Sequence, residues 1–200
     1  MIIEGSLRAG DRVPEEQFCR QLGISRTPLR EALKILAAEG LVELRPNRGS
    51  VIASVQTDEI EATFEVMGAL EELTGMLVCA RISNVEIERI AQLHEQMAEA
   101  FRRSDRARYF ALNQDIHQEL VLATKNPILA TSYRAFAEKI QRGRFQANYD
   151  PSRWEESMRE HEAIMQALRG RRAEELARLL REHSDLTGRA VVSHLRAVSG

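Results

Sequence analysis

The sequence predicts a mainly α-helical protein in which an N-terminal winged helix-turn-helix precedes an antiparallel, all-helical bundle of about six helices. Short helical patterns and two strand-like runs fill the first 55 residues, whereas the rest is helical almost throughout. Gly and Pro become rare after Pro46 and recur mainly between helices. We therefore expect two domains, residues 1–55 and 56–200.

Composition and charge narrow the class of protein. The 200 residues carry a net charge of −2, so nucleic-acid binding would need a local basic patch. Cys19 and Cys79 lack metal-type spacing and are typical of packed thiols in a reducing compartment. The start MIIEGSLRAGD has no signal-peptide pattern, and no stretch approaches the roughly 18 apolar residues of a membrane span. We expect a cytoplasmic protein without a membrane partner.

The first domain divides into a helix, a tight turn, a helix and a hairpin. Pro14 opens a short helix that carries Phe18 and Leu22 four residues apart, and Gly23 ends it. Ser25 is a favourable N-cap for a second helix that runs to about residue 39. An aliphatic stripe on this helix consists of Leu29, Ala32, Leu33 and Leu36. LVEL and SVIASV then read as two strands joined by the turn RPNRG.

The second domain contains six helical stretches. Thr57 is the expected cap of the first, and Ser83 with Glu86 forms an S-x-x-E capping box for the second. The remaining four are predicted at residues 106–124, 127–145, 154–168 and from 173 onward. Helices of this length with short loops favour an antiparallel bundle.

The stretch SRTPLREAL predicts a DNA-reading helix. If the aliphatic stripe faces the core, Arg26, Thr27, Arg30 and Lys34 lie on the opposite side. They lie near the N-terminus of the helix, where free N–H groups and the helix dipole favour phosphate. Arg can bind guanine through two hydrogen bonds, and Thr can contact a thymine methyl group. Pro28 is tolerated in the first turn, where its missing N–H costs little.

The turn RPNRG adds Arg45 and Arg48 at the tip of the predicted wing, and Gly49 would allow a close backbone approach to DNA. An exposed basic face without a partner is the alternative interpretation of a lone arginine pair. The order of the elements together with a basic wing favours DNA binding.

The run PEEQFCRQLGISRTPLREALKILAAEGLVELRPNRGSVI closely resembles the DNA-binding domain of GntR-type bacterial transcription regulators. The matching motifs are G-x-L-x-x-G-x-x-x-P, S-R-T-P-x-R-E-A-L, and E-G-L-V followed by R-G. The resemblance implies major-groove contacts from the start of the second helix and minor-groove contacts from the wing. The residues concerned are Ser25, Arg26, Thr27, Pro28 and Arg30 on the helix, and Arg48 and Gly49 on the wing.

Two features depart from the family pattern. Members usually have further residues ahead of IIEGSL, so the first helix of the family pattern is expected to be truncated. Some relatives also have an Arg near the start of the preceding helix. This chain has Glu15 and Glu16 there, so we do not expect that phosphate contact.

Four polar residues of the helical part form a candidate metal site. Asn113 and His117 lie four apart on one helix face, whereas His161 and His183 belong to two other helices. Three imidazoles and one oxygen ligand can hold Zn²⁺ or Ni²⁺. Spacing alone also fits hydrogen-bonded core histidines, which is our interpretation of His94 and His194.

The helical part resembles the FCD effector-binding domain. The matching pieces are VMGALEELTGMLVCA, H-x-x-L followed by K-N-P-I-L, E-H-x-x-I, and a closing His. The resemblance implies that Asn113, His117, His161 and His183 bind a divalent metal, against which a small carboxylate effector lies. Asn113 stands where Asp is common, and Met67 stands where many relatives have an Arg. Arg144 or Arg134 could supply the missing positive charge, although either could be a solvated arginine.

We therefore predict a metabolite-responsive transcriptional regulator, a repressor, and not an enzyme. It would be a homodimer on a two-fold, double-stranded operator, and a small effector, an organic acid, would alter its DNA affinity. The alternatives are a metal-dependent enzyme using the three histidines, with Glu119 or Glu160 as base, and a metal-free dimerisation module.

Overall fold

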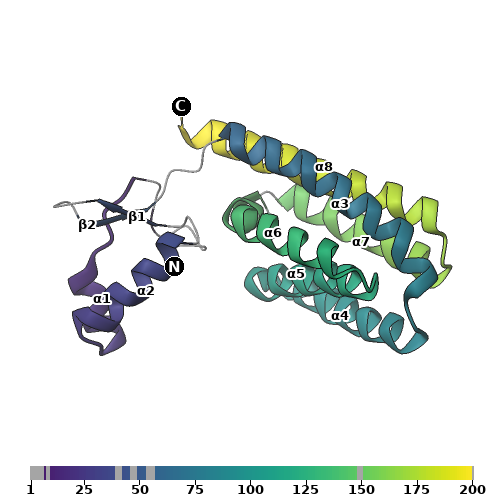
Figure 1. Cartoon of the computed structure of the whole chain (residues 1–200), viewed down its shortest axis with the longest axis horizontal. Helices are drawn as coiled ribbons and strands as arrows, with labels where there is room; N and C mark the ends of the chain where they lie inside the picture. The colour runs from purple at the N-terminus through teal and green to yellow at the C-terminus, as the bar shows by residue number, and fades with distance from the viewer. Residues whose placement is uncertain are drawn as a thin grey trace. The chain divides into compact units, whose positions relative to one another are not determined.

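The computed structural model describes residues 7, 10–38, 42–45, 49–52, 57–147 and 151–199 (Figure 1). The chain forms two compact units, Met1–Gln56 and Thr57–Gly200. Helices dominate, and the sheet within the described residues is a two-stranded antiparallel hairpin. The predicted fold class, a winged helix-turn-helix with a helical second domain, is confirmed.

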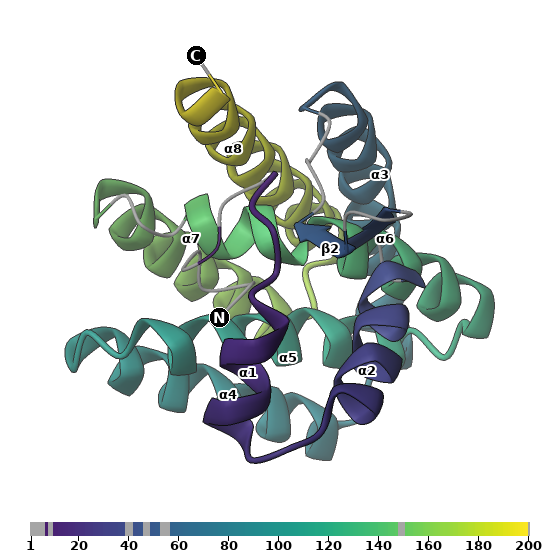
Figure 2. The same ribbon diagram turned by 90° about the vertical axis from the view of Figure 1, so that its left-hand side faces the viewer.

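The first unit, which we call the reading head, contains two helices and the hairpin. Its elements are α1 (Glu15–Leu22), α2 (Arg26–Ala38), β1 (Val42–Arg45) and β2 (Gly49–Ile52). Gly23 ends α1 in the left-handed conformation, with a φ of 64°, and so allows the short connection to α2 (Figure 2). The hairpin register runs from Val42 opposite Ile52 to Arg45 opposite Gly49.

A third extended segment lies along β2, and the sequence patterns did not predict it. The Val13 amide donates to the Ser50 carbonyl at 2.8 Å, and the Ile52 amide donates to the Asp11 carbonyl at 2.8 Å. Arg12 forms a bridge with Val51. The segment is too short to show the alternation of apolar and polar residues that identifies a strand.

The core of the reading head lies between α1, α2 and the hairpin. Its buried members are Val13, Phe18, Leu29, Leu33, Val42 and Ile52. The predicted stripe on α2 is buried at Leu29 and Leu33, half-buried at Leu36 and exposed at Ala32. Leu22, four residues after Phe18, is 62% exposed and lies in the last turn of α1, next to Gly23.

The second unit, which we call the helical unit, contains six helices within the residues that the structure describes. They are α3 (Thr57–Arg81), α4 (Asn84–Arg102), α5 (Arg106–Ala123), α6 (Pro127–Ala147), α7 (Pro151–Arg169) and α8 (Ala173–Ser199). The predicted capping box at Ser83 and Glu86 is confirmed. Thr57 is already the first helical residue of α3, and α7 begins at Pro151, ahead of the predicted start.

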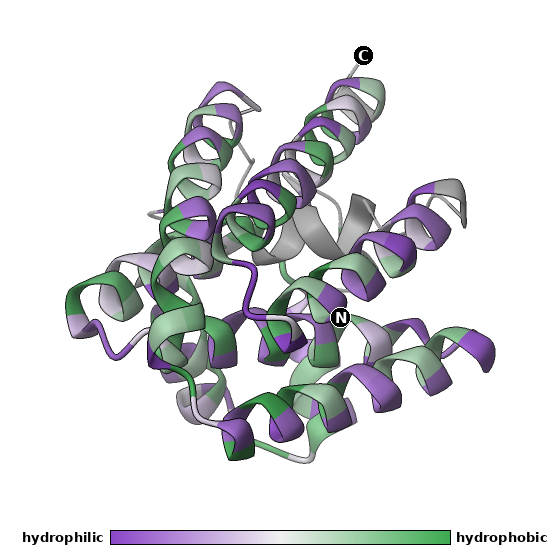
Figure 3. Cartoon of the chain, turned by 90° about the vertical axis from the view of Figure 1, so that its right-hand side faces the viewer, coloured by the Kyte–Doolittle hydropathy of each residue, from purple (hydrophilic) through white to green (hydrophobic). Residues whose placement is uncertain are grey.

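Helices α3 and α8 run side by side (Figures 1 and 3). Small residues allow their close approach: a Cβ added at Gly75 would lie 2.4 Å from backbone atoms of Ala177, and one added at Gly188 would lie 2.7 Å from Phe64. No helix of the described residues is both long enough and apolar enough to cross a membrane.

Candidate functional site

The reading head exposes the predicted DNA-contacting residues of α2. Ser25 precedes the helix, and Arg26, Thr27, Pro28 and Arg30 are all exposed on its first turns. Leu29 and Leu33 turn the other way, into the core. The apolar stripe therefore fixes which side of α2 is presented to solvent, as the helical spacing predicts.

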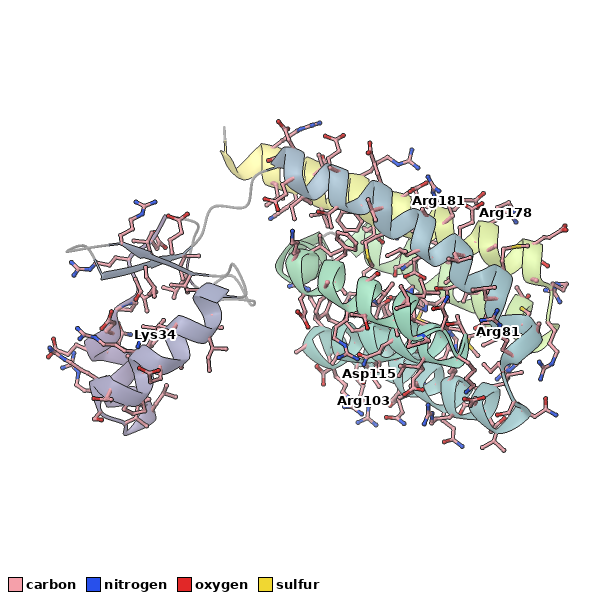
Figure 4. The ribbon with its side chains drawn as sticks, in the orientation of Figure 1. Lys34, Arg81, Arg103, Asp115, Arg178 and Arg181 are labelled. Atoms are coloured by element: carbon pink, nitrogen blue, oxygen red, sulfur yellow. The ribbon has the colours of Figure 1, made fainter. Side chains whose placement is uncertain are left out.

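An open groove of about 1150 Å³ runs between α1, α2 and the hairpin. Six cationic side chains line it: Arg12, Arg20, Arg26, Arg30, Lys34 and Arg45. Figure 4 labels Lys34 on α2. Arg12 and Arg20 were not recognised in the sequence, because Arg12 lies on the unpredicted extended segment and Arg20 on a helix that begins with two acidic residues. The net charge of the whole chain, −2, gives no indication of this local basic patch.

Glu15 places a negative charge among these cations. Its Oε2 accepts from the Arg30 Nε at 3.5 Å, and its Oε1 accepts from the Ser50 hydroxyl at 3.3 Å. This carboxylate therefore joins α1 to the recognition helix and to the wing strand. Arg26, by contrast, has no ion-pair partner among the described residues.

Two of the predicted wing residues lie within the described strands: Arg45 ends β1, and Gly49 begins β2. Gly49 has a φ of 75°, a conformation that side chains other than glycine rarely adopt, and a Cβ there would lie 3.4 Å from the Arg12 guanidinium. Arg48 lies outside the described residues. Arg45 donates to Glu43 from Nε at 3.1 Å and from Nη2 at 2.8 Å.

The helical unit brings the three predicted histidines together. His117 comes from α5, His161 from α7 and His183 from α8, and all three are buried. One ligand nitrogen from each lies within 4.8 Å of the other two. The ring centroids are 4.8 to 5.1 Å apart. Residues that are far apart in the chain thus converge on one interior point, which we call the histidine cluster.

The chemistry of His161 fits a metal ligand. Its ring is fully buried, and neither ring nitrogen has a hydrogen-bond partner among the described residues. Burial, followed by the neighbouring rings of His183 and His117, holds the pKa of His161 well below its usual value. The ring is therefore neutral, the form that coordinates a cation. An unpartnered buried imidazole is costly unless another group satisfies it, and three imidazoles suit Zn²⁺ or Ni²⁺.

Three other polar residues of the helical unit lie at different places relative to the histidine cluster. Asn113 is buried one turn before His117 on α5. Asp115, two residues after Asn113, is exposed on the same helix (Figure 4). His94 on α4 is outside the cluster, and its Nε2 lies 3.8 Å from a Glu162 carboxylate oxygen on α7. Burial lowers the pKa of His94.

Sequence reasoning missed a buried arginine that is linked to the cluster through Glu160. Arg153, in the first turns of α7, is buried and donates to Glu160 from both terminal nitrogens, at 2.6 and 2.7 Å. Glu160 in turn lies 2.6 Å from the Nδ1 of His183. Position in the helix alone could not show that the Arg153 side chain turns inward.

The two arginines predicted to bind an effector are Arg134 and Arg144. Arg134 is exposed and lines a separate groove of about 210 Å³ between α5 and α6, with Gln118 and Glu138. Arg144 lies within α6, and its side chain is outside the described residues.

One turn from the cluster, α5 and α7 are joined by a polar contact. The Tyr109 hydroxyl donates to the Ser157 Oγ at 3.0 Å, and Tyr109 and Ser157 precede Asn113 and His161 by one turn. Burial raises the pKa of Tyr109 to about 12, which keeps the phenol protonated. Phe101 and Trp154 pack around the same tyrosine with ring centroids 5.0 to 6.4 Å apart.

A basic winged helix-turn-helix followed by an all-helical unit defines a class of DNA-binding transcriptional regulators. The FCD domain family matches residues 62–186, and the family described as bacterial regulatory proteins, gntR family, matches residues 1–52. The chain belongs to the GntR family of transcriptional regulators and carries an FCD domain. Its family and relatives are transcriptional regulators, and the protein is a regulator and not an enzyme.

Similar proteins agree with this assignment. The uncharacterized HTH-type transcriptional regulator YdhC of Bacillus subtilis is 26% identical over 175 residues, which cover 87% of this chain and 78% of the relative. A probable D-xylose utilization operon transcriptional repressor of Paenarthrobacter nicotinovorans is 30% identical over 70% of this chain and 61% of its own length. The structure of Escherichia coli McbR/YncC has the same fold, with a TM-score of 0.78 at 18% identity over 100% of this chain and 93% of that one.

Proposed function

We propose that this regulator is a repressor whose histidine cluster binds a divalent metal ion and a small carboxylate effector, and that the effector changes operator affinity. The single observation that carries the proposal is the convergence of three buried histidines inside the helical unit of a DNA-binding chain. The name of the Paenarthrobacter relative supports repression. By linkage, a ligand that prefers one arrangement of the bundle shifts the DNA-binding equilibrium.

The basic groove of the reading head supports operator binding through Arg26, Thr27, Pro28 and Arg30, with Ser25 at the helix start and Gly49 on the wing. The test uses DNA selected by the protein from genomic fragments. Arg26→Ala or Arg30→Ala should weaken specific binding by about 1–3 kcal/mol for each hydrogen-bonded base that the variant no longer reaches. Arg103→Ala, at an exposed position of the helical unit, is the matched control. Unchanged binding in both head variants would refute this face as the interface.

Asn113, His117, His161 and His183 are the proposed ligands of the ion. An ion with these ligands would be a Lewis acid with positions left for water or an anionic oxygen. Titration calorimetry with Zn²⁺ and Ni²⁺ tests this assignment. His117→Ala should abolish binding of about one equivalent, whereas His94→Ala, outside the cluster, should retain it. A wild-type chain that binds neither ion would refute the metal assignment and favour a metal-free dimerisation module.

The charge around the cluster supports an anionic effector. The charged side chains that touch the cluster or its partners include two carboxylates, Glu71 and Glu160, and one guanidinium, Arg153. A divalent ion would turn their single net negative charge into a single positive charge. A monocarboxylate would neutralise that charge, so we expect monocarboxylates to bind more tightly than neutral analogues of the same size. Displacement of a fluorescent operator by a library of organic acids is the corresponding screen.

An apolar stripe on α3 supports homodimerisation. Val66, Leu73 and Met76 fall on one face of the helix, and each exposes more than two fifths of its surface. A second copy of this chain is the occupant we propose, because a two-fold operator needs two reading heads. Light scattering should give a dimer for the wild type and a monomer for Leu73→Glu. Glu72→Gln, at a neighbouring exposed position, is the control. A wild-type monomer at micromolar concentration would refute the dimer.

A further inference from the structure

Two carboxylates contact the histidine cluster from outside it. Glu71, fully buried on α3, places its Oε1 2.8 Å from the Nδ1 of His117, a close ionic contact that lacks hydrogen-bond geometry. The Tyr133 hydroxyl on α6 donates to the same oxygen at 2.9 Å. Glu71 is therefore held from one side by a phenol and faces an imidazole on the other.

Glu160 forms the second contact, and this one is a hydrogen bond. Its Oε2 lies 2.6 Å from the Nδ1 of His183, and Arg153 donates to both of its oxygens. Arg153 also donates to the Thr187 hydroxyl at 3.1 Å, one turn along α8 from His183. Two hydrogen bonds from Arg153 thus orient this carboxylate towards the ring, and the bond to Thr187 holds Arg153 itself in place.

The position of the two carboxylates determines which ring nitrogen faces the ion. An acceptor at Nδ1 favours the tautomer that carries the proton there and leaves the lone pair on Nε2. Glu71 and Glu160 do not belong to the set of residues whose ligand atoms converge, so they act on the rings and not as ligands. His117 and His183 would therefore both present Nε2 to the interior.

His161 is held differently. Its ring lies edge-on to the other two, with interplanar angles of 86° and 80°, and neither nitrogen has a hydrogen-bond partner among the described residues. Packing sets its orientation, and no carboxylate fixes its tautomer within the part of the chain that the structure describes. The cluster thus contains one ring hydrogen-bonded to a carboxylate, one ring in close contact with a carboxylate, and one ring that an ion would complete.

The four proposed ligands carry no negative charge that would balance the charge of a divalent cation. Asn113 is a neutral amide, and the three imidazoles coordinate in their neutral form, so the four ligands bring no charge to a divalent cation. Carboxylates bonded to ligating imidazoles raise the basicity of the rings and place negative charge next to the ion.

From these contacts we infer that Glu71 and Glu160 are positioning residues of the ion site: they fix His117 and His183 with Nε2 inward and supply the negative charge that a neutral ligand set lacks. The inference rests on the proposed metal function. The alternative is that both are buried ion pairs that only stabilise the fold, and such pairs would leave metal affinity unchanged in a variant that remains folded.

The experiment combines metal affinity with a direct measurement of the tautomers. Glu71→Gln and Glu160→Gln should each weaken Zn²⁺ binding by about 10- to 100-fold in a chelator competition. Tyr133→Phe should weaken it less, because it loosens Glu71 without removing the charge. Glu119→Gln on α5 is the matched control, since Glu119 pairs with Arg89 outside the cluster.

Long-range ¹H–¹⁵N NMR of the metal-free full chain reports the tautomers. In the wild type, His117 and His183 should both carry the proton on Nδ1. Glu71→Gln should change only the His117 pattern, and Glu160→Gln only that of His183. If Glu71→Gln does not fold, Glu160→Gln and Tyr133→Phe still decide between the two roles.

The outcomes separate the positioning role from the metal site itself. Folded variants that bind Zn²⁺ as tightly as a metal-binding wild type, with unchanged tautomers, would overturn the positioning role and leave the metal site standing. A wild-type chain that binds no Zn²⁺ would overturn both.

Discussion

Substitution of Gly75 tests how closely α3 and α8, the two longest described helices of the helical unit, pack. It lies on α3, one turn from Glu71, and a Cβ built there would lie 2.4 Å from both the Cα and the backbone nitrogen of Ala177 on α8. Backbone atoms cannot rotate aside. Gly75→Ala therefore requires α8 to move away, together with His183 on the same helix.

The expected loss of stability follows from two opposing contributions. In a helix interior, replacing Gly by Ala gains about 1 kcal/mol. Overpacking a close contact costs about 1–3 kcal/mol, and a backbone overlap of this size belongs at or above the upper end. The net loss is then about 2 kcal/mol, which corresponds to a fall in Tm of about 4–8 °C for a unit of this size.

Gly68 provides the matched control on the same helix. A Cβ there meets the Arg181 and Asp185 side chains at 2.8 to 2.9 Å, and these are flexible side chains that can rotate away. Thermal unfolding followed by far-UV circular dichroism should therefore show Gly68→Ala at or above the wild-type Tm. Gly75→Ala with a Tm equal to or above that of the wild type would refute the close-packing argument, and Zn²⁺ titration of the same sample would show whether the cluster is displaced.

Three further predictions concern single side chains. Burial raises the pKa of the Cys79 thiol, so at pH 8 Cys19 should react with a thiol reagent well before Cys79, and equal rates in the folded chain would contradict this. The hydrogen bond from Lys125 lowers the pKa of Glu86 to about 2, so its stabilising effect is present above its usual value of 4.5 and is lost as pH falls towards 2. Glu86→Gln should therefore lower the Tm slightly at pH 7, by an amount that shrinks below pH 4.5, and a pH-independent difference would contradict the assignment. Glu15→Gln should raise DNA affinity a few-fold in fluorescence anisotropy, because it removes a negative charge from the basic groove, and weaker binding would show instead that Glu15 orients Arg30.

Local signals predicted most of the fold. Gly23 and the Ser83–Glu86 capping box define helix ends through the chain's own backbone, so they can be read without tertiary information. The segment near Arg12 was missed because its pairing with β2 is a long-range contact. The exposure of Leu22 could not be predicted, because helical spacing gives the face of a residue and not whether a partner covers the last turn.

The candidate site could be predicted only in part from the sequence. Spacing placed Asn113 and His117 on one face, and the resemblance to the FCD domain linked them to His161 and His183. Whether these four bind a metal remains a prediction. Glu71 and Arg153 could not be assigned from the sequence, because both are charged residues on helices where a solvated position is the ordinary expectation. Their burial follows from the register between helices, which no single helix encodes.

The course of α8 has a mechanical consequence. The same helix carries His183 and, further along, Gly188 against Phe64 and Arg196, which pairs with Glu61 at 2.9 Å. A continuous helix transmits a displacement along its axis with little loss, as rigid elements do in ligand-driven switches. A small shift of the imidazole would thus travel the length of α8 and reach the opening turns of α3, the point where the chain passes to its DNA-reading part.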